Sequence, residues 1–153
     1  MSKKSFSQIK LGIIGGGQLA RMLALDAAPL GIEVHILSEK PTDPAALVTR
    51  FWHEGQPSSE KDQFELCQKV DYLTFESEFY KMDSLIQIQD KMNCQIFPNP
   101  QVMQIVQHRF TQKKLLQKYK IKTADFLHVK SHDDLIKASK LFKNSFVLKK
   151  SMG

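Results

Sequence analysis

A glycine-rich segment at 15–20, Gly-Gly-Gly-Gln-Leu-Ala, constrains the fold of this chain more than any other stretch. The apolar run 9–14 precedes it, and a segment with apolar residues at helical spacing follows it. A G-x-G-x-x-G/A pattern in that position joins a buried strand to a helix. Gly15 permits the tight turn, Gly17 lets an anion approach the backbone, and Ala20 lets the helix lie close to the sheet. The free amides at the start of such a helix attract phosphate.

Strands and helices are expected to alternate over the first hundred residues. Apolar runs predict strands at 9–14, 32–37, 48–52, 72–75 and 95–97. Helical spacing predicts helices at 18–28, 60–69 and 84–92, with a short helical turn after Asp43-Pro44. This order predicts an α/β fold, with a mostly parallel sheet in a Rossmann-like domain. The apolar stripe of the first helix is expected to consist of Leu19, Met22, Leu23 and Leu25.

The segment Pro98-Asn99-Pro100 interrupts the periodic pattern, so a domain boundary is expected near Pro100. Residues 1–100 then form the Rossmann-like domain, and 101–153 begin a second one. This second part is expected to contain helices at 102–108, 111–119 and from Ser131 to Leu141, and strands at 126–129 and 146–149. About fifty residues are few for an independent domain. The chain is therefore expected to be part of a longer protein that continues after Gly153.

An acidic cluster, Thr74-Phe75-Glu76-Ser77-Glu78, ends the fourth predicted strand. Open α/β sheets place ligand contacts at the carboxyl ends of their strands. Glu76 is the better site candidate, because Glu78 is more simply explained as an acid near a helix start. The Glu76 carboxylate is expected to accept hydrogen bonds from ribose hydroxyls or a substrate amine.

Charge and cysteine content exclude several classes of protein. The formal charge is +6, but the lysines occur singly or in pairs rather than in a dense basic block, so no nucleic-acid partner is expected. Cys67 and Cys94 lie on separate predicted elements without a second Cys or His at metal-ligand spacing. Neither a metal site nor a disulfide is predicted, and a cytoplasmic location is expected. No apolar run is long enough for a membrane segment.

A dinucleotide cofactor usually requires an acidic residue at the end of the second strand, where it binds the ribose hydroxyls. Ser38 occupies that strand end, and Glu39 follows it. A non-catalytic module that binds NAD or another nucleotide therefore stays open as an alternative, and phosphate binding is expected in either case.

The run 11–22 contains Gly-Gly-Gly-Gln-Leu-Ala-Arg-Met, a pattern far more specific than bare glycines. It closely resembles the opening of the N5-carboxyaminoimidazole ribonucleotide synthetase family, which belongs to the ATP-grasp superfamily. The similarity covers essentially the whole chain and continues through Leu30-Gly31-Ile32, Pro44-Ala45, Thr74-Phe75-Glu76, Phe97-Pro98, His108-Arg109-Phe110-Thr111-Gln112-Lys113 and Phe146-Val147-Leu148-Lys149. One departure is His108, where the family usually carries Asp before the arginine.

The resemblance implies an enzyme that uses ATP and bicarbonate to carboxylate the amine of 5-aminoimidazole ribonucleotide, releasing ADP and phosphate. It assigns the first domain to the ribonucleotide, with Gln18 and Leu19 at the 5'-phosphate and Glu76 among the substrate contacts. It implies that Arg109 and Lys149 meet ATP, and that the first domain forms a homodimer. The family's Mg²⁺-binding carboxylates and phosphate loop are expected after Gly153, so this chain alone is expected to be inactive.

A second relative stays open within the same superfamily, the formate-dependent glycinamide ribonucleotide transformylases. They typically carry Glu at the position of Gln18 and Pro-Glu-x-Glu rather than Phe-Glu-x-Glu at the acidic strand end. Gln18 and Phe75 therefore favour the carboxylating enzyme.

Overall fold

The computed structural model describes residues 9–92, 94–143 and 145–152. The chain divides into two units, Met1–Gln104 and Ile105–Gly153, and each is considered by itself.

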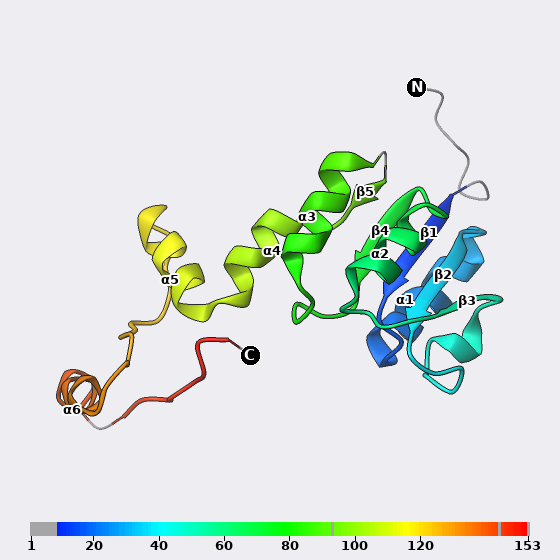
Figure 1. The fold of residues 1–153 in the computed structure, drawn as a ribbon. Coiled ribbons are helices and arrows are strands. Elements are labelled where there is room, and N and C mark those ends of the chain that lie inside the picture. The colour runs from blue at the N-terminus through cyan, green and yellow to red at the C-terminus, as the bar shows by residue number, and fades with distance from the viewer. Residues whose placement is uncertain (1–8, 93, 144, 153) are drawn as a thin grey trace. The chain divides into compact units, whose positions relative to one another are not determined.

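The first unit is built on a five-stranded sheet in the order β3-β2-β1-β4-β5 (Figure 1). Its strands are β1 (Lys10–Ile14), β2 (Glu33–Ser38), β3 (Phe51–Glu54), β4 (Tyr72–Phe75) and β5 (Gln95–Ile96). All four pairings are parallel, and Ile14 at the end of β1 lies opposite both Leu37 and Phe75. The predicted α/β fold with a parallel sheet is confirmed, and the central position of β1 brings its carboxyl end beside those of β2 and β4.

Helices pack on both faces of this sheet. They are α1 (Gln18–Ala27), α2 (Glu60–Cys67) and α3 (Met82–Lys91), with short 3₁₀ turns η2 (Ala28–Leu30) and η3 (Ala46–Val48), and α4 (Pro100–Gln107) follows. Ile13 of β1 packs with α1, whereas its neighbour Ile14 packs with α2 and α3, because successive strand residues point to opposite faces. None of the helices among the described residues combines the length and the apolar character needed to cross a membrane.

The face that α1 turns toward the sheet differs from the prediction. Ala20, Ala24 and Ala27 are buried, and their spacing places them on one side of the helix. These small side chains let the helix lie close to the strands. The predicted apolar stripe points outward instead, with exposed fractions of 60%, 59%, 42% and 48% for Leu19, Met22, Leu23 and Leu25.

The third strand begins three residues later than predicted. Residues 46–48 form η3, and β3 pairs with β2 from His35↔Phe51 onward. The Thr49 hydroxyl donates to the Val34 carbonyl at 2.5 Å and accepts from the Phe51 amide at 3.1 Å. The Thr49 side chain thus takes the place of a backbone-to-backbone hydrogen bond between strands, near the position where the strand was expected to start.

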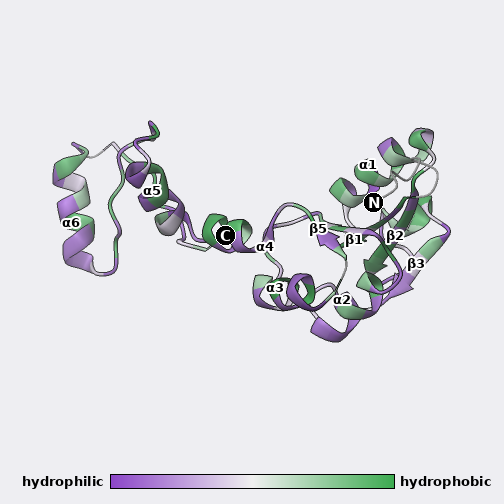
Figure 2. Cartoon of the chain, turned by 90° about the horizontal axis from the view of Figure 1, so that it is seen from above, coloured by the Kyte–Doolittle hydropathy of each residue, from purple (hydrophilic) through white to green (hydrophobic). Residues whose placement is uncertain are grey.

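The second unit contains α5 (Arg109–Lys118) and α6 (His132–Leu141), confirming two predicted helices. The Ser131 side chain caps α6 by accepting from the Asp134 amide at 3.2 Å, while the Asp134 carboxylate accepts from the Lys130 amide. Figure 2 shows hydrophilic and hydrophobic residues alternating along α6. The strands predicted at 126–129 and 146–149 are wrong, because a strand exists only when a neighbour pairs with it and neither segment has such a partner among the described residues.

Candidate functional site

The glycine turn lies at the carboxyl edge of the sheet, between β1 and α1. The Gly15 amide donates to the Leu37 carbonyl at 2.9 Å, and the Glu76 amide donates to the Ile14 carbonyl at 3.1 Å. These bonds fasten the turn to the ends of β2 and β4. Gly15 has φ of +106°, a conformation that L side chains rarely adopt, so the tight turn requires glycine here.

Glu76 reaches from the end of β4 to the start of α1. Its Oε1 accepts from the Gly17 amide at 3.0 Å, and its Oε2 accepts from the Ala20 amide at 3.2 Å. The partial positive charge at a helix N-terminus stabilises a carboxylate in this place. A Cβ on residue 17 would lie 2.7 Å from Oε2. In this structure the anion that approaches the Gly17 backbone is the protein's own carboxylate.

Two amides at the same helix start lie beside this carboxylate. Gln18 and Leu19 are the first residues of α1, and both are exposed. Within the described ranges, no protein group accepts from their N–H groups. The first amides of a helix lack partners inside the helix, so these two can bind an incoming anion.

Tyr80 adds a residue that the sequence did not single out. Its hydroxyl donates to Oε1 of Glu76 at 3.5 Å and would contact a Cβ on Gly15. Burial raises the pKa of the Tyr80 phenol, and the negative charge of Glu76 raises it further. The phenol therefore stays protonated and keeps donating to the carboxylate. No pattern around position 80 could have indicated this, because a non-helical segment carries the residue back to the turn.

The side of the turn facing β2 is closed. A Cβ on Gly16 would lie 2.5 Å from Cβ of Ser38 and 2.9 Å from Cβ of Asp43. Ser38 is buried and accepts from the Trp52 indole at 3.1 Å, whereas Glu39 is exposed. A neutral serine whose hydroxyl is already hydrogen-bonded to Trp52 therefore lies where dinucleotide-binding domains carry an acidic residue. Glu78 is also exposed.

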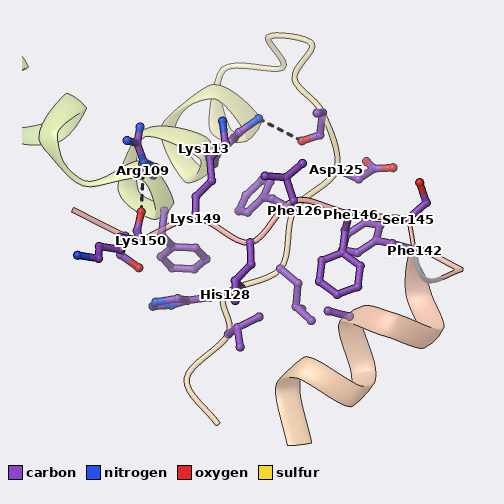
Figure 3. A pocket seen from close by; sticks show the side chains of 18 residues that line it. Arg109, Lys113, Asp125, Phe126, His128, Phe142, Ser145, Phe146, Lys149 and Lys150 are labelled. Carbon is purple, nitrogen blue, oxygen red and sulfur yellow. Dashed lines mark hydrogen bonds between the residues drawn. The ribbon is translucent and has the colours of Figure 1, made fainter. Parts of the chain in front are cut away.

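The second unit contains a cavity of about 550 Å³ between α5, α6 and the segments 124–129 and 145–151. Both predicted ATP residues, Arg109 and Lys149, line it, together with Lys113 and Lys150 (Figure 3). The Arg109 amide donates to the Ser151 carbonyl at 2.8 Å, and its Nε donates to the Lys150 carbonyl at 3.2 Å. These bonds bring the start of α5 and the end of the chain together.

Aromatic rings and one further lysine shape the same cavity. The ring of Phe110 stacks on that of His128 with centroids 4.0 Å apart. The Lys113 ammonium donates to the Thr123 hydroxyl and to the Ala124 carbonyl. The sequence assigned no role to Lys113 beyond its place in the family resemblance. Its position in the cavity follows from a chain reversal after α5 that no local pattern encodes.

The described residues do not form a metal site. No group of three or more His, Cys, Asp or Glu side chains among them could hold a metal ion.

Comparisons with known proteins identify the family of this chain. The ribonucleotide synthetase preATP-grasp domain family matches residues 8–107. N5-carboxyaminoimidazole ribonucleotide synthase of Staphylococcus haemolyticus is 33% identical over 97% of this chain and 40% of its own length. The crystal structure of the Staphylococcus aureus synthetase complexed with ADP has a TM-score of 0.84 and 31% identity, covering 95% of this chain and 39% of that one.

A third similar structure is the synthase from Aspergillus clavatus in complex with ADP and 5-aminoimidazole ribonucleotide. Its TM-score is 0.80 at 28% identity, covering 89% of this chain and 36% of that one. The chain thus spans about two fifths of the length of these relatives. With 100 of its 153 residues inside the match, the chain belongs to the ribonucleotide synthetase preATP-grasp domain family.

Proposed function

We propose that residues 1–100 bind 5-aminoimidazole ribonucleotide at the glycine turn. The amides of Gln18 and Leu19 receive its 5'-phosphate, and Glu76 accepts from a ribose hydroxyl or the substrate amine. Gly15 and Gly17 shape the turn that makes these contacts possible. The observation that carries the proposal is a pair of amides without an acceptor among the described residues, on two exposed residues beside the hydrogen-bonded carboxylate of Glu76.

Residues 101–153 are proposed to begin an ATP-grasp domain, with Arg109 and Lys149 on the polyphosphate of ATP. A guanidinium and an ammonium group suit phosphate oxygens, and both line one cavity. The relative from Staphylococcus aureus was solved with ADP, which supports a nucleotide site in this family.

The longer protein is proposed to be an ATP-dependent ligase of de novo purine biosynthesis. It converts 5-aminoimidazole ribonucleotide, bicarbonate and ATP to N5-carboxyaminoimidazole ribonucleotide, ADP and phosphate, forming a C–N bond. This chain contributes binding and orientation, because holding the sugar phosphate at the turn fixes where the amine is presented. Mg²⁺ supplies phosphate charge neutralisation in such reactions. The family resemblance puts the carboxylates that bind it outside this chain, so the chain alone is proposed to be inactive.

Two alternatives are less well supported. NAD binding in the Rossmann manner needs an acid where Ser38 is buried against Trp52. A transformylase acting on glycinamide ribonucleotide would typically carry Glu in place of Gln18, as noted above. The carboxylating enzyme therefore remains the proposal.

A homodimer formed through the first domain and a cytoplasmic location complete the proposal. The outward apolar side chains of α1 offer surface for such an association. Cys67 and Cys94 are both free and buried, which suits a reducing compartment. Analytical ultracentrifugation of the longer protein checks the dimer, and a monomer at micromolar concentration would refute it.

Calorimetric titration of the 153-residue chain tests the substrate directly. The chain should bind 5-aminoimidazole ribonucleotide at least about tenfold more tightly than the corresponding nucleoside, because the nucleoside lacks the phosphate. Equal affinities for the two compounds would show that the glycine turn does not bind the 5'-phosphate.

A further inference from the structure

The start of α1 offers four neighbouring backbone amides, at residues 17–20, and the protein itself occupies half of them. The Glu76 carboxylate accepts from the amides of Gly17 and Ala20, whereas the amides of Gln18 and Leu19, two exposed residues, have no acceptor among the described residues. A carboxylate thus sits where a dinucleotide or diphosphate would place its second charged group. Any phosphate that reaches the open amides lies beside a negative charge of the protein.

We propose that Glu76 determines which phosphates the turn accepts: it excludes diphosphates and dinucleotides, and it admits a sugar phosphate monoester with a hydroxyl or amine to donate to the carboxylate. The accepted ligand class rests on the proposed function, whereas the exclusion rests only on the geometry of the turn.

The hydrogen-bond capacity of Glu76 supports this selectivity. A carboxylate has about four acceptor positions, two on each oxygen. Oε1 accepts from Gly17 and Tyr80, and Oε2 accepts from Ala20, so the described residues use three of them. One position on Oε2 is left for a donor. A sugar hydroxyl or an amine can fill it, but a second phosphate offers oxygens that only repel it.

The carboxylate is also held in place, so it cannot easily withdraw for an anion. The backbone of Glu76 is bonded to Ile14 of β1, and its side chain is bonded to α1 and to Tyr80. Gly17 leaves just enough room for Oε2. Moving the side chain away would leave two helix amides without their acceptor, which costs stability.

Titration of the wild-type chain and of Glu76→Gln with inorganic pyrophosphate tests the exclusion. The substitution removes the charge at nearly constant shape, so pyrophosphate should bind at least about tenfold more tightly to the variant. Glu78→Gln is the matched control, since it removes one charge two residues away and should change the affinity by less than about twofold. An equal increase in pyrophosphate affinity in both variants, or no increase in Glu76→Gln, would overturn the inference.

A second arm separates this inference from the proposed function. 5-Aminoimidazole ribonucleotide should bind Glu76→Gln at least about tenfold more weakly than the wild-type chain, the reverse of pyrophosphate. If the wild-type chain binds no ribonucleotide but Glu76→Gln still binds pyrophosphate more tightly than the wild type does, the proposed function fails and the exclusion by Glu76 stands.

If Glu76→Gln does not fold in plain buffer, circular dichroism with added pyrophosphate replaces the titration. An anion that binds only the folded variant should restore its helical signal, because it takes the place of the lost carboxylate. A variant that stays unfolded at saturating pyrophosphate, while Glu78→Gln folds normally, would contradict the inference.

Discussion

The two units of the chain differ in the apolar surface that they bury and in their charge. The first closes a five-stranded sheet between helices and buries apolar residues on both faces. In the described part of the second, Ala138 is the sole buried hydrophobic residue, while side chains such as Leu141 and Leu148 are more than 60% exposed. Residues 105–153 also carry twelve Lys and Arg against three Asp and Glu, whereas 1–104 carry ten against thirteen. The first unit thus has a core on both faces of its sheet, whereas the described part of the second buries little apolar surface and the second unit carries the net positive charge.

The largest difference between the units should appear in their cores. Leu73→Ala removes a fully buried side chain from β4 and should lower the free energy of unfolding by about 3 kcal/mol. Leu148→Ala, in the second unit, should cost less than about 0.5 kcal/mol because Leu148 is 63% exposed. Urea unfolding followed by circular dichroism measures both values. Comparable losses would show that the second unit has a core of its own.

A substitution at the turn should separate folding from binding. Gly15→Ala places a Cβ against Tyr80 and Glu76 at φ of +106°, and it should cost about 2 kcal/mol and abolish ribonucleotide binding. Gly31→Ala is the control, because Gly31 also has positive φ, +74°, but lies after η2. It should lower stability by about 1 kcal/mol and leave binding unchanged. A loss of ribonucleotide affinity in Gly31→Ala would assign the effect to general destabilisation.

Removing a positive charge from the cavity of the second unit should weaken ATP binding without affecting ligand binding at the glycine turn. Arg109→Ala in the longer protein should weaken ATP binding about tenfold, since a guanidinium that pairs with phosphate is lost. Ribonucleotide affinity should stay the same. Fluorescence titration with a labelled ATP analogue measures the first quantity. Unchanged nucleotide affinity in both Arg109→Ala and Lys149→Met would remove this cavity from the ATP site.

The smallest expected effect compares two equivalent helix caps. Ser59 caps α2 in the first unit and Ser131 caps α6 in the second, each by accepting from the amide three residues on. Ser59→Ala should lower global stability by about 1 kcal/mol, because α2 packs into the core. Ser131→Ala should instead speed amide hydrogen exchange in α6 alone. Slower amide exchange throughout the first unit in Ser59→Ala would contradict the first expectation. A loss of global stability in Ser131→Ala would show that the two units unfold as one cooperative body.

Much of the first unit could be predicted from the sequence, because local patterns decide it. The strand, turn and helix around Gly15–Gly17 follow from apolar periodicity and from backbone freedom at glycine. The face of α1 could not be predicted in this way, since both its alanines and its leucines are apolar. Only the tight approach of Ala20 and Ala24 to the sheet decides between them.

Glu76 could be predicted as a candidate site residue, but Tyr80 and the contacts of Glu76 could not. The position of Glu76 at a strand end indicated a site, yet its bonds to Gly17 and Ala20 depend on the pairing of β1 with β4. The strands expected at 126–129 and 146–149 failed for a related reason. Extended apolar runs form strands only when partners exist, and the described chain provides none.

Amide chemical shifts provide the most direct test of phosphate binding at the turn. In ¹⁵N–¹H spectra of the labelled chain, 5-aminoimidazole ribonucleotide should shift the Gln18 and Leu19 amides most strongly, because they donate to the 5'-phosphate. The amides of Gly17 and Ala20 should move less, since they stay bonded to Glu76. Saturating ribonucleotide that leaves Gln18 and Leu19 unshifted would contradict phosphate binding at this helix start.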